Sequence, residues 1–69
     1  MIIGKVKSYD EAEGLGLIQP DHGGQAVLVN GIAIQRAGLC DLVEGQRVSF
    51  ETVRDRRSGM MAAHNIETI

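Results

Sequence analysis

Several features that often identify a protein class are scarce or missing in this chain of 69 residues. The single cysteine, Cys40, excludes a disulfide within the chain and favours a reducing compartment. No apolar run approaches the roughly 20 residues of a membrane span, and the opening MIIGKVK lacks the pattern of a signal peptide. The 7 Lys and Arg residues do not outnumber the 9 Asp and Glu residues, so the basic excess typical of nucleic-acid binders is absent. We therefore expect a cytoplasmic protein, and its net charge does not indicate what it binds.

Patterns for catalysis, metal binding and cofactor binding are also missing. The chain has no G-x-S-x-G motif, and no recognisable activating residues surround Cys40, which is expected to fill a loop or the core. His22 and His64 lie far apart and no cluster has metal-ligand spacing. The glycines Gly14 and Gly16 are not part of a dinucleotide fingerprint, and are expected to permit a turn and a close backbone approach. We expect no enzyme activity, no metal, no cofactor and no small-molecule substrate.

What the chain does contain is a succession of short alternating apolar segments, as expected for one small all-β domain over residues 1–69. Polar and glycine-rich segments separate them and predict turns. The region 31–46 lacks a sustained period and predicts only a short 3₁₀ piece within GIAIQRAG. The predicted strands are Ile2–Tyr9, Leu15–Gln19, Ala26–Asn30, Arg47–Val53 and Met60–Ile69.

Five short strands with the longest loop between the third and fourth predict a small five-stranded antiparallel barrel, in which closure of the sheet removes exposed edges. Alternation places Val6 inward and its lysine neighbours outward. Side chains fill a barrel of this size, so a binding surface must lie on its outside. The phase of the last strand is left open, including which of Met60 and Met61 faces inward. The predicted core contains Val6, Ile18, Val27, Val29, Val48, Phe50 and Ile66.

The sequence resembles the bacterial cold shock proteins over nearly its whole length. GKVKSYDEAEGLGLI is similar to the family's G-x-V-K-W-F-N-x-x-K-G-F-G-F-I, and LVEGQRVSFE to its L-x-E-G-Q-x-V-S-F. AVLVNGIAI resembles the segment D-V-F-V-H-F-S-A-I, and SGMMAAHNI the closing G-P-x-A-x-N-V. The resemblance implies an OB-type barrel that binds single-stranded RNA or DNA, with roles such as RNA chaperone or regulator of transcription or translation.

The chain departs from the family where that family presents aromatic rings, in its RNP1 and RNP2 motifs. Leucines stand at three of those positions, and the family's Trp is Ser8 here. Where the family has a lysine before the RNP1 glycine, this chain has Glu13. Its negative charge adds repulsion for phosphate. Because stacking on an aromatic ring contributes about 1–3 kcal/mol per base, we expect weak, sequence-tolerant binding. The three leucines are Leu15, Leu17 and Leu28.

The resemblance and the charge pattern together predict a nucleic-acid site. Lysines and arginines would position phosphates, while Tyr9 and the three leucines would touch bases. The lysines could instead be the solvated side of an edge strand, and the arginines a solvated loop. The predicted site residues are Lys5, Lys7, Tyr9, Leu15, Leu17, Leu28, Asn30, Arg54, Arg56 and Arg57.

A protein-contact module is the alternative prediction. Adjacent short strands would bring the leucines into one aliphatic patch, and an exposed patch with a polar rim often marks a protein interface. Such a module would use the patch to bind a partner or to form a homodimer.

Overall fold

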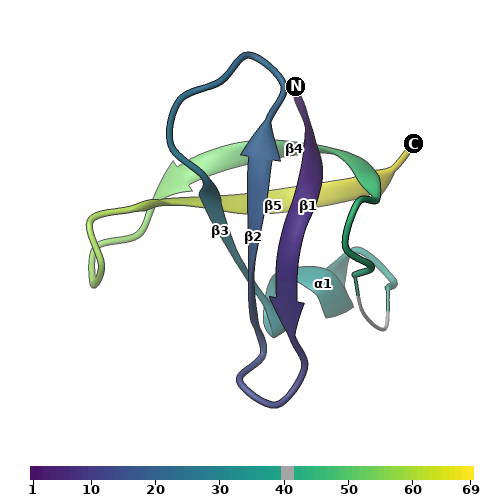
Figure 1. The fold of residues 1–69 in the computed structure, drawn as a ribbon. Helices are drawn as coiled ribbons and strands as arrows, with labels where there is room; N and C mark the ends of the chain where they lie inside the picture. Colours follow the sequence, from purple (N-terminus) through teal and green to yellow (C-terminus); the bar gives the residue numbers. More distant parts are fainter. Residues whose placement is uncertain (40–41) are drawn as a thin grey trace.

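A computed structural model of the chain describes residues 1–39 and 42–69; the predicted role of Cys40 lies outside the described residues. Within these residues the strands close into a barrel in the order β1-β2-β3-β5-β4 (Figure 1). The pairings are antiparallel except for the parallel contact of β3 with β5. The elements are β1 (Ile2–Asp10), β2 (Leu15–Pro20), β3 (Val27–Asn30), α1 (Gly31–Arg36), β4 (Arg47–Arg54) and β5 (Met61–Thr68). The predicted five-stranded OB-type barrel is confirmed.

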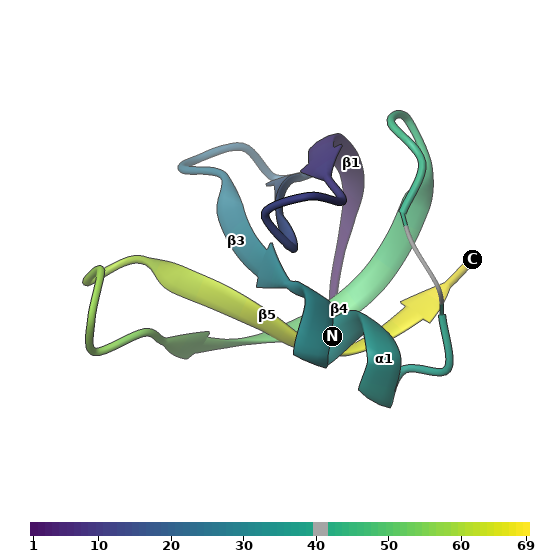
Figure 2. The same ribbon diagram turned by 90° about the horizontal axis from the view of Figure 1, so that it is seen from below.

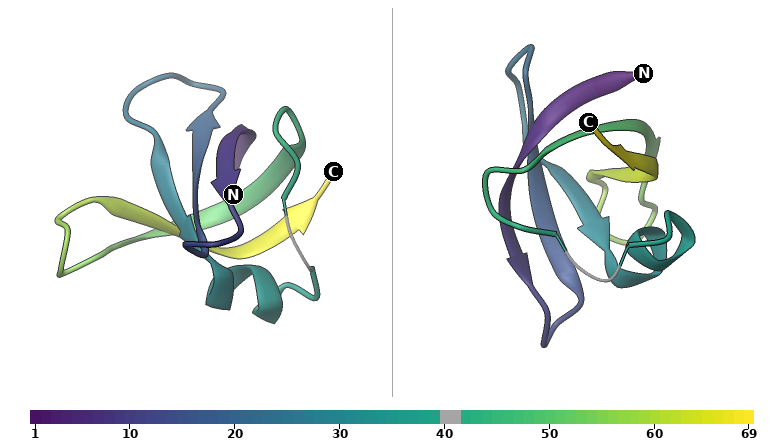
Figure 3. Two further views of the ribbon diagram at one scale, coloured as in Figure 1. Left: turned by 60° about the horizontal axis from the view of Figure 1, so that its bottom comes forward. Right: turned by 90° about the vertical axis from the view of Figure 1, so that its right-hand side faces the viewer.

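The strands form two crossing layers. β1, β2 and β3 run side by side as a meander, while the long β4–β5 hairpin crosses behind them (Figure 1). The helix α1 covers one end of the barrel next to β5, as the view from below shows (Figure 2). The tip of the β4–β5 hairpin extends beyond the barrel on the side of β3 (Figure 3). The outer surface of the meander and this hairpin tip are therefore neighbours.

The core is built from the inward positions of the alternating strands. All seven residues predicted for it are buried, and Phe50 at its centre has 0% of its surface exposed. The helix and the segment before β4 add Ile34 and Leu42, and β5 adds Ala63. Burial of these side chains supplies the main stabilising free energy of a domain this small.

A β-bulge in β1 changes which side chains face outward. The register with β2 shifts between Val6 and Ser8, so Lys7 has no partner and both Lys7 and Ser8 are exposed. A bulge adds one residue and inverts the alternation beyond it. As a result Tyr9 lies on the inner side, opposite Gly16. Strict alternation along this strand would not give that position.

A second bulge resolves the phase of the last strand. The register of β4 with β5 shifts between Ser49 and Glu51, and Asn65 opposite this shift adopts φ +51°. Asparagine is among the residues that tolerate this left-handed conformation best. Ala63 and Ile66 then face the core, three positions apart. Neither Met60 nor Met61, the two candidates for the inward position, is buried.

The segment after β3 is a short α-helix, so the predicted 3₁₀ piece is wrong. Asn30 is its N-cap, and the side-chain Oδ1 accepts the backbone N–H of Ala33 at 2.9 Å. Ile34 points into the core and holds the helix against β3 and β5. The cap and this one buried contact favour the α-helical turn over the tighter one.

Two glycines in the meander are required by close packing. A Cβ on Gly4 would lie 2.7 Å from the carbonyl oxygen of Gln19, and one on Gly16 would lie 2.8 Å from both Ser8 O and Tyr9 Cδ1. Gly14 instead adopts φ +66° in the β1–β2 turn. The predicted roles of Gly14 in a turn and Gly16 in a close approach are confirmed.

Two kinds of feature are absent from the described residues. No helix in them is long and apolar enough to cross a membrane. No group of three or more potential metal-ligating side chains occurs among residues 1–39 and 42–69.

Candidate functional site

The three leucines lie together on the outside of the meander, and we call them the leucine face. Leu17 pairs directly with Leu28 across β2 and β3, and Leu15 lies two residues along from Leu17 on the same side. Leu15 is 43% exposed, and the other two are half-buried. They line an open depression of about 480 Å³ together with Ser8 and Met60. The barrel thus carries apolar side chains on its outer surface that are not part of its core.

Tyr9 borders the leucine face from the inner side. It is half-buried against the core, and its ring packs over Gly16. It still lines the depression in front of the leucines. The residue thus borders the depression, while its ring packs inward over Gly16 and its hydroxyl lies near Gly31.

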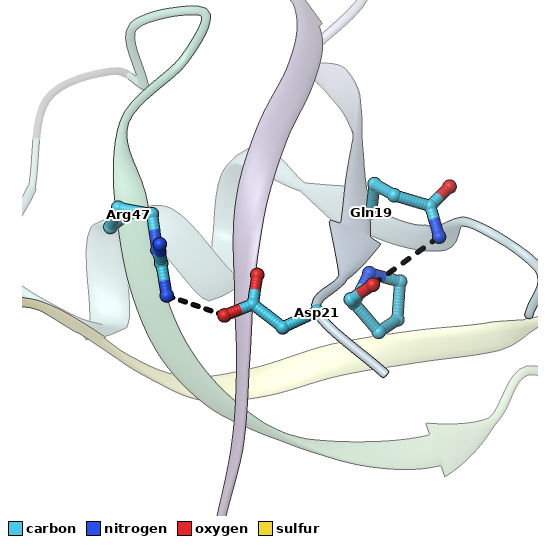
Figure 4. Close-up of polar contacts among 4 residues, drawn as sticks. Gln19, Asp21 and Arg47 are labelled. Atoms are coloured by element: carbon cyan, nitrogen blue, oxygen red, sulfur yellow. Dashed lines mark hydrogen bonds and ion pairs between the residues drawn. The ribbon is translucent and has the colours of Figure 1, made fainter. Parts of the chain in front are cut away.

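Lys5 and Lys7 lie near the middle of β1, and Lys7 directly precedes Ser8 of the leucine depression. Both are exposed and line an open depression of about 450 Å³ with Gln19 and Asp21. The carboxylate of Asp21 forms an ion pair with Arg47 on β4, across the β1 strand (Figure 4). That pairing reduces the negative charge that Asp21 presents to a phosphate near the lysines.

The position of β1 also tests one alternative for these lysines. β1 pairs with β2 on one side and with β4 on the other. It is therefore not an edge strand, and lysines on it are not needed to block edge-to-edge association. Their exposure on a closed barrel leaves them available to a ligand.

An acidic turn lies beside the leucine face, at the end where Leu15 pairs with Asp10. Asp10, Glu11 and Glu13 are exposed in the β1–β2 connection. The Oδ1 atom of Asp10 accepts the backbone N–H of Ala12 at 3.0 Å, which fixes the turn. These carboxylates repel phosphate, so the favourable side of the leucine face for a nucleic-acid backbone lies away from this turn.

The arginine loop, residues 54–57, lies on that favourable side. Asp55 orders it by accepting the backbone N–H of Arg57 at 3.0 Å and the Ser58 hydroxyl at 3.1 Å. The side chains of Arg54, Arg56 and Arg57 form no ion pair with another described residue. A solvated loop would fit these facts, but the three arginines also share an open depression of about 610 Å³ with Leu28 and Asn30.

Leu28 connects the two depressions. It pairs with Leu17 on β2 and with Ala62 on β5, through the parallel contact of β3 and β5. The surface is continuous from the leucine face to the arginine loop because both depressions include Leu28. The structure thus brings together the leucines, Tyr9, Asn30 and the arginines, while Lys5 and Lys7 lie in a separate depression beside them.

The predicted contact Asn30 has a structural task that the sequence did not reveal. Its Oδ1 caps α1, while the residue remains exposed beside the arginine loop. Its side-chain amide N–H groups can still donate to a phosphate or a base.

Two further residues of this surface were not among the predicted site residues. Met60 and Ala62 join it from the end of the β4–β5 hairpin. The signal that could have found them is the OB-type topology itself, in which β3 lies beside β5.

Comparisons with known proteins agree with this geometry. The family model described as the "'Cold-shock' DNA-binding domain" matches residues 2–69. The chain is 46% identical over 67 residues to "Probable cold shock protein y4cH" of Sinorhizobium fredii, covering 97% of each chain. It is also 46% identical to "Cold shock protein CspA" of Rhizobium meliloti, with 91% of each chain covered. "Cold shock-like protein CspE" of Escherichia coli is 43% identical, over 94% of this chain and 93% of the relative.

Proposed function

Because this chain belongs to the cold-shock DNA-binding domain family and is a cold-shock-like protein that binds single-stranded nucleic acid, we propose that the strand lies across the leucine face and the arginine loop. The observation that supports this most directly is the continuous surface joined at Leu28. It places apolar side chains for bases beside cations for phosphates.

The chemistry of the leucine face predicts weak and sequence-tolerant binding. Leucine offers apolar contact to a base but no flat π surface, and stacking on an aromatic ring contributes about 1–3 kcal/mol per base. Apolar contact does not distinguish one base from another, since a leucine side chain has no hydrogen-bonding group to read the base edge. Tyr9 is the one aromatic residue of the predicted set, and its ring packs inward over Gly16, so the leucines provide most of the apolar contact to bases.

Charge directs the backbone of the strand. The acidic β1–β2 turn disfavours phosphate at one end, while the arginine loop and the lysines Lys5 and Lys7 favour it elsewhere. Affinity should therefore depend on salt although the net charge of the chain is −2. The roles of individual residues, and the cytoplasmic location, are part of this proposal.

The protein-contact module is not favoured. Membership of a nucleic-acid-binding family accounts for the exposed apolar face without a protein partner. If the leucines form a homodimer, the apparent mass should increase with protein concentration. Leu17→Asp should abolish that increase. Sedimentation of the two proteins over a range of concentrations tests that alternative.

Fluorescence anisotropy with a labelled oligothymidine, titrated at several salt concentrations, tests the proposed site. Each phosphate contact on a single strand contributes about 0.7 to the slope of log K against log salt. We expect Arg56→Gln with Arg57→Gln to reduce that slope by up to about 1.4, and Lys7→Ala by up to about 0.7.

The matched control is Arg56→Lys with Arg57→Lys, which keeps both charges and should keep the slope. Absence of binding at low salt would contradict the proposal, and so would binding whose salt slope is unchanged in both the arginine variant and Lys7→Ala.

A further inference from the structure

We propose that a bound strand continues past the arginine loop into a second depression, where His64 supplies a stacking ring and Arg36 binds a phosphate. This inference rests on the proposed function and extends its footprint. The depression has a volume of about 250 Å³ and lies where α1 meets β5. Its lining includes Asn30, Arg36, Val53, Ala62, His64 and Asn65.

The depression is continuous with the proposed site. Asn30, Val53 and Ala62 line it and also line the depression of the arginine loop. The two depressions therefore adjoin, and a strand whose phosphates lie on the arginines can extend from one into the other. The acidic turn at the other end of the leucine face makes this the electrostatically favoured direction for the backbone.

The bulge in β5 places His64 at this position. β5 has one more residue than β4 between the paired positions Ser49↔Glu67 and Glu51↔His64, and Asn65 takes φ +51° to accommodate it. Bulges often re-aim a side chain beside a functional surface. The imidazole of His64 is half-exposed, and its Nε2 lies 3.9 Å from Oε2 of Glu51. Histidine rings are among those on which unpaired bases stack.

Arg36 supplies the charge. It is the last residue of α1 and is exposed, and no ion pair joins it to another described residue. A guanidinium matches the geometry of a phosphate and binds it through paired hydrogen bonds. The depression thus combines a ring on which a base can stack with a guanidinium that can bind a phosphate. Together they would bind a nucleotide whatever its base.

Two lengths of fluorescein-labelled oligothymidine test the inference, one of about 4 and one of about 12 nucleotides, which span the range of site sizes for an OB fold. For the longer strand we expect His64→Leu to weaken binding about tenfold and His64→Phe to restore it, as loss and recovery of one stacked base predict. Arg36→Gln should reduce the salt slope for that strand by about 0.7. The shorter strand should bind all these variants as it binds the unaltered chain.

Gln35→Ala is the matched control, because Gln35 is an exposed neighbour on the same helix. It should leave the affinity for both strands unchanged. If the longer strand binds His64→Leu and Arg36→Gln normally, or if the shorter strand loses as much affinity, the inference is wrong while the proposed function stands. If neither strand binds the unaltered chain, the proposed function itself is wrong.

Discussion

The inner and outer faces of the β1–β3 meander share a backbone but follow different constraints. On the inner face Val6, Ile18 and Val29 have 0–1% of their surface exposed, and each is surrounded by other core residues. On the outer face Leu15, Leu17 and Leu28 are equally apolar yet remain partly exposed. The inner residues hold the barrel together, so they must keep their shape. The outer residues contribute less to stability, which leaves their chemistry free to set affinity.

Replacing one residue on each face by alanine gives the largest expected difference in the free energy of unfolding. Ile18→Ala removes a fully buried side chain and leaves a cavity, which should lower the free energy of unfolding by about 2–5 kcal/mol. Leu15→Ala, three residues away on the outer face, should lower it by less than about 1 kcal/mol. Urea denaturation of the two variants measures both values. Equal losses would mean that the two faces do not divide stability and binding as described.

Gly16 tests the contact between the two faces. A Cβ at this position would meet Ser8 O and Tyr9 Cδ1 at 2.8 Å, so Gly16→Ala should cost about 1–3 kcal/mol as the strand or the ring moves. In Gly31→Ala the nearest atoms lie 3.8 Å away, and the residue belongs to α1.

That control should leave stability unchanged or raise it by up to about 1 kcal/mol, because alanine favours a helix. Thermal unfolding followed by circular dichroism compares the two variants. A fully tolerated Gly16→Ala would show that Tyr9 is not held as tightly as the packing indicates.

Leu17→Phe sharpens the comparison from the outer side. A ring at this partly exposed position should add about 1–3 kcal/mol of binding free energy for one base, which corresponds to about fivefold to 150-fold tighter binding. Stability should change little, since the site is not part of the core. Anisotropy titration with oligothymidine measures the gain, and Leu17→Ile is the control of similar volume without a ring. Equal affinity of the two variants would exclude stacking at this position.

The smallest expected effect concerns the helix cap beside the leucine face. Asn30→Ala removes the acceptor for the Ala33 N–H and should lower the free energy of unfolding by about 1 kcal/mol. Asn30→Ser retains a capping oxygen and should recover most of that loss. Denaturation curves of the two variants decide the matter, and a loss in both would point to a role of the amide other than capping.

The sequence predicted the inner face well because burial imposes a period of two on a strand. Val6, Val48 and Phe50 could be assigned to the core from alternation alone. The pattern breaks at the bulges, where Lys7 and Asn65 change the phase by one residue. Bulges depend on pairing with a partner strand, so a single strand's pattern does not reveal them.

The candidate site was only partly predictable for a similar reason. The leucines and arginines could be named from the resemblance and from charge. Their joining at Leu28 depends on the parallel contact of β3 with β5, between residues 28 and 62, which no local pattern encodes. The cap formed by Asn30 was missed because the segment after it is too short to show helical periodicity.

The seam between β3 and β5 has a consequence for the motions of the barrel. The ladder there contains the single registered pair Leu28↔Ala62, whereas the neighbouring antiparallel seams contain several. Fewer shared hydrogen bonds mean a lower cost of local opening, so we expect amide hydrogen exchange to be fastest along this line of closure. A bound nucleic-acid strand that contacts both the leucine face and the arginine loop would span the same seam. We therefore expect it to slow the exchange and stabilise the closed barrel.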